Sequence, residues 1–144
     1  MLYSHDRNQL RNVFINAWDK RNSPKTLEPL EQNIINTIAE HPEYHRFFEN
    51  GEANIDQDFS PEMGQVNPYL HISMHMAIRE QLSINQPKDV SNYYQKLLLK
   101  IKDSHEVEHV MMECLSEMIW RAQRENSAPS EKEYLNCLQS QTTK

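Results

Sequence analysis

The chain has 144 residues, the size of one ordinary domain, of which 38% are hydrophobic and 25% are charged. This balance allows a packed core and excludes a disordered chain, while the longest aliphatic run, 97–99, is far below the roughly 20 apolar residues that cross a bilayer. A formal net charge of −6, with no cluster of Lys and Arg, argues against nucleic acid as a partner.

The compartment is indicated by two further features. The first ten residues, "MLYSHDRNQL", lack the apolar segment of a secretion signal. The only cysteines, Cys114 and Cys137, have neither CxxC spacing nor a disulfide-rich pattern, which favours reduced thiols. We therefore predict a single cytoplasmic domain over 1–144, without a membrane partner.

The first half of the chain is predicted to form three helices. Apolar residues repeat at helical spacing over 10–18, and "NSPK" ends that helix. A second helix begins at Pro29 and stops near His41, because the residue before Pro42 is disfavoured in a helix. A short helix then runs to Glu49. The predicted buried faces consist of Leu10, Val13, Phe14, Ala17 and Trp18, and of Leu30, Ile34, Ile35 and Ile38.

A long central loop is predicted over 50–67, where Gly51, Pro61 and Gly64 interrupt regular structure. Asn67 and Pro68 have the residue types of a helix cap and a first turn, so a helix is expected to begin there. Its predicted buried face consists of His71, Met74, His75, Ile78 and Leu82.

Three more helices are predicted in the last third of the chain. One follows "QPKD", and the longest begins at Asp103, with Glu106 in the reciprocal capping position, and runs to about Glu125. Ser130 and Glu133 repeat this capping pattern and open the last helix. No stretch alternates as a strand would, so we predict an all-α bundle of about six to seven helices. The residues expected to be buried are Tyr94, Leu97, Leu98, Ile101, Tyr134, Leu135 and Leu138.

Pairs of histidines four residues apart are the chemical signal of this sequence. They occur in "HPEYH" (41–45), "HISMH" (71–75) and "HEVEH" (105–109). Seven histidines scattered at random would give about 0.3 such pairs. Residues four apart lie on one face of a helix, so two imidazoles at this spacing can reach one ion.

The predicted metal site combines these pairs across helices. We expect the helices that contain His71 and His105 to face each other, because helical bundles build metal sites by aiming such pairs inward. Glu113 follows His109 at the same spacing and borders the same face. Imidazole and carboxylate ligands without thiolate suit iron, zinc or manganese. The candidate ligands are His71, His75, His105, His109 and Glu113, with His45 or His41 completing the site.

The 105–109 pair also matches HExxH, the pattern of zinc proteases. In that interpretation His105 and His109 bind zinc, Glu106 is the general base, and a downstream acid is the third ligand. Such enzymes hold a peptide against a sheet edge, and no strand is predicted here. Glu106 has an alternative role in capping its helix.

The chain resembles two groups of proteins. The segments "EPLEQNIINTIAEHPEYH", "NPYLHISMHMAIREQLS" and "MMECLSEMIWRAQRENSAPSEKEYL" are similar to a family of short bacterial proteins known as the domain of unknown function 1841. This resemblance covers nearly the whole length and implies a bacterial, cytoplasmic protein. More loosely, HxxxH at His71 and His75 and HxxxE at His109 and Glu113 resemble the ligands of hemerythrin-like di-iron bundles. The break at Pro42 and the shorter helices depart from that pattern.

We therefore predict a metal-binding helical protein whose ion, of the non-haem iron type, binds a small molecule or performs redox chemistry. The alternatives are a metal-free protein-interaction module and an HExxH zinc hydrolase.

Overall fold

The structure, a computed structural model, describes residues 2–60 and 65–144, with side chains from residue 7 onward. Every regular element in these ranges is a helix, which confirms the all-α prediction. Contacts group the chain into two compact units, 1–76 and 77–144. The sequence-based prediction of a single domain stays a prediction.

None of the described helices has the length and apolar character needed to cross a membrane.

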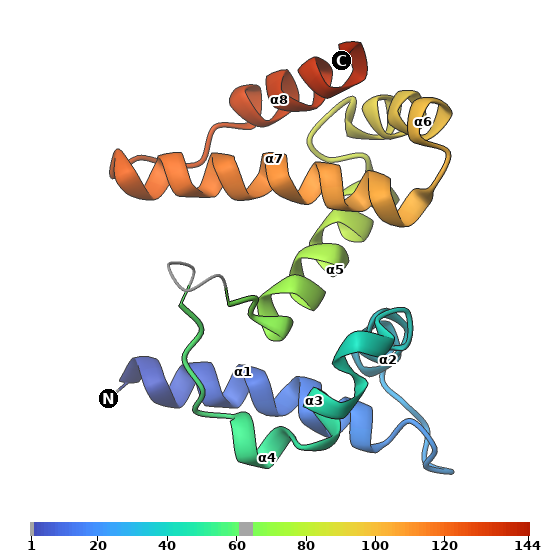
Figure 1. Ribbon diagram of the computed structural model, residues 1–144, viewed down its shortest axis with the longest axis vertical. Coiled ribbons are helices and arrows are strands. Elements are labelled where there is room, and N and C mark those ends of the chain that lie inside the picture. The colour runs from blue at the N-terminus through green and yellow to red at the C-terminus, as the bar shows by residue number, and fades with distance from the viewer. Residues whose placement is uncertain (1, 61–64) are drawn as a thin grey trace. The chain divides into compact units, whose positions relative to one another are not determined.

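In the first unit, α1 packs against α2, α3 and α4, as Figure 1 shows. A short 3-10 turn joins α2 to α3, and the unit ends within α5. The elements are α1 (Leu2–Asp19), α2 (Pro29–Ala39), η1 (Pro42–Tyr44), α3 (His45–Glu49), α4 (Gly51–Asn54) and α5 (Pro68–Ile84).

The start and end of α2 agree with the prediction from the sequence. Pro29 occupies the first turn, and Glu28 and Glu31 form a reciprocal capping box across it. The helix ends before His41, whose backbone (φ −124°, ψ 72°) is non-helical as the following Pro42 requires. His41 is thereby placed at the junction of α2 and the η1 turn, outside both helices.

The buried face of α1 differs from the predicted one at its edge. Leu10 is 61% exposed, whereas Arg11 is 5% exposed, so the pattern of apolar residues alone misplaced the face. The Arg11 guanidinium donates hydrogen bonds to the carbonyl oxygens of Ile55 and Gln57 and lies over the Tyr69 ring. The buried core of this unit consists of Phe14, Ile15, Ala17, Trp18, Ile34, Ile35, Ile38, Phe48, Tyr69 and Ile72.

Two other predictions for this unit need correction. Leu30 is 54% exposed rather than buried, because it lies in the first turn of α2, before the buried stripe that begins at Ile34. The loop predicted over 50–67 starts later, since Gly51–Asn54 forms the short helix α4. Part of that loop prediction, 61–64, lies outside the described residues.

The second unit contains the end of α5 and three helices that pack on one another (Figure 1). Asp103 caps α7 by accepting hydrogen bonds from the backbone N–H groups of His105 and Glu106, and Ser130 caps α8 through the N–H of Glu133. Both predicted helix starts are confirmed. The helices are α6 (Val90–Ile101), α7 (Ser104–Arg124) and α8 (Glu131–Thr143).

The cysteines differ from the sequence-based expectation. Cys114 on α7 and Cys137 on α8 are joined by a disulfide, so the prediction of two reduced thiols is wrong for this structure. Their spacing of 23 residues carried no signal, because the two positions approach each other only when α8 folds back along α7. The bond therefore crosslinks two helices that also pack together.

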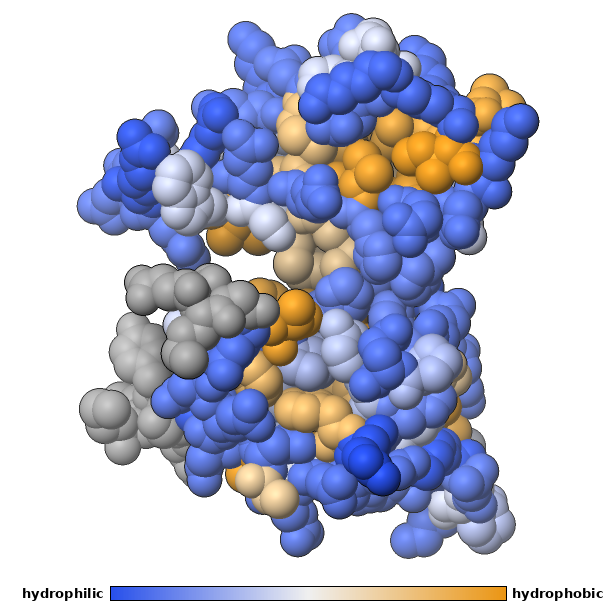
Figure 2. Space-filling model, viewed as in Figure 1, coloured by the Kyte–Doolittle hydropathy of each residue, from blue (hydrophilic) through white to orange (hydrophobic). Residues whose placement is uncertain are grey.

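Hydrophilic residues cover most of the face drawn in Figure 2, with apolar patches between them. The exposed large apolar side chains include Leu99 and Trp120. Apolar atoms contribute more than half of an ordinary protein surface, so these side chains alone do not define a binding site.

Candidate metal centre

Three histidines of the first unit bring their Nε2 atoms together. His41 Nε2 lies 3.1 Å from His75 Nε2, and His75 Nε2 lies 3.2 Å from His71 Nε2. His71 and His75 lie one turn apart on α5, while His41 comes from the junction after α2. We call His41, His71 and His75 the histidine trio.

Two nitrogen–nitrogen separations within the trio are close to those of ligands on one ion. Zinc binds imidazole nitrogen at about 2.0–2.1 Å, so two nitrogens at tetrahedral positions lie about 3.3–3.4 Å apart. The observed separations of 3.1 and 3.2 Å are within a few tenths of an ångström of this value. His75 therefore lies at about the spacing of two ligands on one ion from both His41 and His71.

The Nδ1 atom of His41 forms a hydrogen bond with the backbone of α2. His41 Nδ1 lies 2.7 Å from the carbonyl oxygen of Thr37, which can only accept a hydrogen bond, so Nδ1 carries the proton. In a neutral ring this leaves a lone pair on Nε2, facing His75. Metal-binding histidines commonly have such a second partner, which fixes the ring and makes the ligand nitrogen more basic.

A transition-metal ion binds imidazole through a ring nitrogen that carries no proton. The Thr37 contact places a proton of His41 on Nδ1, so Nε2 is the nitrogen of this ring that is available as a ligand.

Most of the histidine trio is buried. His41 is 2% exposed and His75 is 0% exposed, whereas His71 is half-buried. Tyr44 stacks on the His41 ring at 5.8 Å between centroids and meets the His71 ring edge-on at 5.6 Å. Burial raises the pKa of the Tyr44 hydroxyl above its ordinary value. The side chain of His71 is thus the most accessible member of the trio.

The second unit contains a separate histidine pair on α7. The rings of His105 and His109 meet edge-to-face with 4.4 Å between centroids. The Glu106 carboxylate lies 3.5 Å from His109 Nδ1 and is largely exposed. The pair thus forms on one helix face, as its four-residue spacing predicts.

The described residues that qualify as potential metal ligands are His41 and His75 in the first unit and His105 and His109 in the second. His71 lies beside His75 within the first unit. Five of the seven predicted ligands therefore lie close to another histidine ring of the same unit, and their role as ligands stays a prediction.

The other two predicted ligands are placed differently. His45 Nε2 donates a hydrogen bond to the Ile38 carbonyl oxygen at 2.9 Å, and the ring packs on Trp18. Since Pro42 breaks the helix between His41 and His45, the two rings do not share a helix face. Glu113 is exposed, because the buried stripe of α7 passes through Met112 and Cys114 on either side of it.

Two residues that contact His41, Thr37 and Tyr44, and one buried carboxylate, Glu108, were not identified from the sequence. Thr37 acts through its backbone carbonyl, which no side-chain pattern reveals. Tyr44 lies between two histidines in the sequence, and an aromatic residue at such a position does not by itself predict contacts with their rings. Glu108 is buried on α7 and accepts hydrogen bonds from Arg79 of α5 at 3.1 and 3.3 Å. A carboxylate among apolar residues, between Val107 and Met111, was the available signal for this last contact.

Comparison with known proteins identifies the family of the chain. The model of a family described as a domain of unknown function, DUF1841, matches residues 6–140. No curated protein and no solved structure matches.

Proposed function

Because the chain belongs to the DUF1841 family, whose description names no function, we propose a function from the histidine geometry: the protein binds a transition-metal ion through imidazole nitrogens. His41, His71 and His75 are the proposed ligands in the first unit. The observation that supports this proposal is the convergence of three Nε2 atoms at 3.1 and 3.2 Å around His75.

The pair on α7 belongs to the same proposal. His105 and His109 present two further imidazoles, within the second unit, at the spacing that metal sites use. Glu106 beside His109 would orient that ring, as outer carboxylates do for metal-binding histidines.

The ligand set limits the chemistry of the ion. Imidazole suits zinc, iron and copper better than magnesium or calcium, which prefer oxygen. Neutral imidazoles leave the charge of a divalent ion uncompensated, so water or a small anionic ligand is favoured at any open position. In such a site zinc lowers the pKa of bound water to about 7, and iron supplies redox chemistry or binds oxygen. We propose a small molecule as the ligand, reached from the side of His71.

Metal content is the first test. Untagged protein should carry close to one equivalent of a transition metal by elemental analysis, or take it up from Zn²⁺ or Fe²⁺ after chelation. His71→Gln and His75→Gln should each abolish this binding. His45→Gln is the matched control: it retains an N–H donor toward the Ile38 carbonyl and should leave metal content unchanged.

The contribution of α7 is tested separately with His105→Gln and His109→Gln. If the protein takes up a second equivalent, these two variants should lose that equivalent and retain the one that His71→Gln and His75→Gln remove. Folded wild-type protein that takes up no transition metal would refute the proposal and favour a metal-free interaction module.

A further inference from the structure

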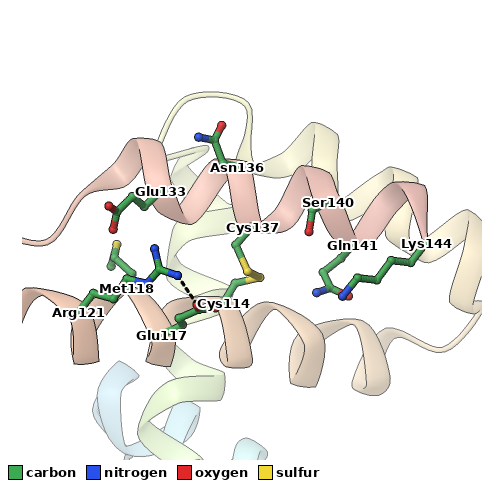
Figure 3. A pocket seen from close by; sticks show the side chains of 10 residues that line it. All are labelled: Cys114, Glu117, Met118, Arg121, Glu133, Asn136, Cys137, Ser140, Gln141 and Lys144. Atoms are coloured by element: carbon green, nitrogen blue, oxygen red, sulfur yellow. Dashed lines mark hydrogen bonds and ion pairs between the residues drawn. A yellow bond between two sulfur atoms is a disulfide. The ribbon is translucent and has the colours of Figure 1, made fainter.

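The Cys114–Cys137 disulfide lines a pocket between α7 and α8. The pocket has a volume of about 380 Å³. Figure 3 shows the sulfur–sulfur bond in its wall, with Glu133 toward one end of α8 and Lys144 toward the other. A volume of this size is in the lower range of pockets that bind small molecules.

The two cysteine residues differ in exposure. Cys114 is 2% exposed and lies in the buried stripe of α7 beside Leu115. Cys137 is half-buried, on the helix that covers the pocket from the other side. A nucleophile that enters the pocket therefore meets Cys137 more readily than Cys114, and accessibility is one of the factors that decide which sulfur is attacked.

The charged groups of the pocket are balanced. Glu117 and Arg121 form an ion pair at 2.9 Å and compensate each other. Glu133 and Lys144 add one charge of each sign to the lining. A ligand that carries both an ammonium and a carboxylate group complements this arrangement.

We propose that this pocket is a thiol–disulfide exchange site, at which a small zwitterionic thiol such as a cysteine-containing peptide forms a mixed disulfide with Cys137. The thiol first loses its proton to water, and the thiolate attacks Cys137 Sγ. A new sulfur–sulfur bond forms, the Cys114–Cys137 bond breaks, and Cys114 leaves as a thiolate that takes a proton from water. A second thiol molecule then attacks the mixed disulfide, releasing the oxidised dimer of the small thiol and the free Cys137 thiol.

The test uses the full-length, oxidised protein with reduced glutathione as the probe. Denatured protein that has not been reduced should show no free thiol on alkylation. After native incubation with glutathione, trapping with iodoacetamide and peptide mapping should find glutathione on Cys137 and the alkyl group on Cys114. Free thiols in the starting protein, exchange only after denaturation, or the reverse labelling would each overturn the proposal.

The pocket itself is tested with a matched pair of variants on α8. Ser140 lines the pocket, whereas Gln139 is an exposed neighbour outside it. Ser140→Trp should slow the exchange several-fold because the indole would occupy part of the pocket, and Gln139→Trp should react at the wild-type rate. Equal rates in the two variants, with unchanged helical circular dichroism, would show that the thiol does not use this pocket.

Discussion

Gly51 is a position where one methyl group would disturb the packing of the first unit. It is buried at the start of α4, and a Cβ atom there would lie 2.5–2.8 Å from three side-chain atoms of Ile15. Ile15 is itself 3% exposed and β-branched, so it has little freedom to move away. We expect Gly51→Ala to lower the free energy of unfolding by about 1–3 kcal/mol. Urea unfolding measures this, and Glu52→Ala, at an exposed site of the same helix, should stay near wild type.

Tyr134 should make the second unit sensitive to alkaline pH. Burial raises the pKa of its hydroxyl, which donates a hydrogen bond to Gln81 Oε1 at 2.7 Å. The native state therefore keeps this proton at a pH where the unfolded chain releases it, above about pH 10. The free energy of unfolding should fall as pH rises beyond that point, by up to about 1.4 kcal/mol per pH unit from this group.

Urea unfolding at several pH values between about 9 and 11 tests this dependence. Tyr134→Phe should be less stable than wild type at neutral pH, because Gln81 loses its partner, by about 1–2 kcal/mol. Its stability should then decline less steeply with pH. An unchanged slope would assign the alkaline sensitivity to other groups.

At the scale of elements, the disulfide is expected to stabilise α8 on α7. Cys114 and Cys137 are separated by 23 residues, and a crosslink that closes a loop of this length stabilises a fold by about 3 kcal/mol through the unfolded chain. Cys137→Ser should therefore lower the free energy of unfolding by about this amount. Wild type unfolded with a reductant should match the variant. A variant as stable as oxidised wild type would mean that the packing of Tyr134 and Leu138 is sufficient to keep α8 in place on α7 without the disulfide.

The sequence predicted helix boundaries well where a side chain acts on its own backbone. Pro29 in the first turn of α2, Asp103 before α7 and Ser130 before α8 all have the predicted roles. Local chemistry decides these positions, so no knowledge of the fold was needed. The same holds for His41, whose place outside the helix follows from Pro42.

Features that depend on distant residues were not predictable in this way. Arg11 is buried because carbonyl oxygens of residues 55 and 57 accept its hydrogen bonds, more than 40 positions away. The disulfide and the pairing of Arg79 with Glu108 likewise depend on how helices pack. In the candidate site, the four-residue pairs identified which imidazoles to consider. Only the structure separated His41 from His45, because the two rings leave the same segment in different directions.

For the whole molecule, metal binding should raise thermal stability. The contact between His41 and His75 joins residues 34 positions apart, so an ion on these nitrogens would crosslink the end of α2 to α5 in the native state. A ligand that binds only the native state at 100 times its Kd contributes about 2.7 kcal/mol. For a chain of this length the corresponding rise in Tm is roughly 5–10 °C.

Thermal unfolding of metal-free and Zn²⁺-loaded protein measures this shift, which should disappear in His75→Gln. Transition metals bind imidazole without its proton, so the shift should also shrink as the pH is lowered. This decrease of the Tm shift at low pH distinguishes ligation by histidines from weak binding to surface carboxylates. The chain has a net charge of −6. Its carboxylates would keep attracting cations below the pH at which imidazole protonates. A shift that survived both acid and His75→Gln would therefore place the ion outside the histidine trio.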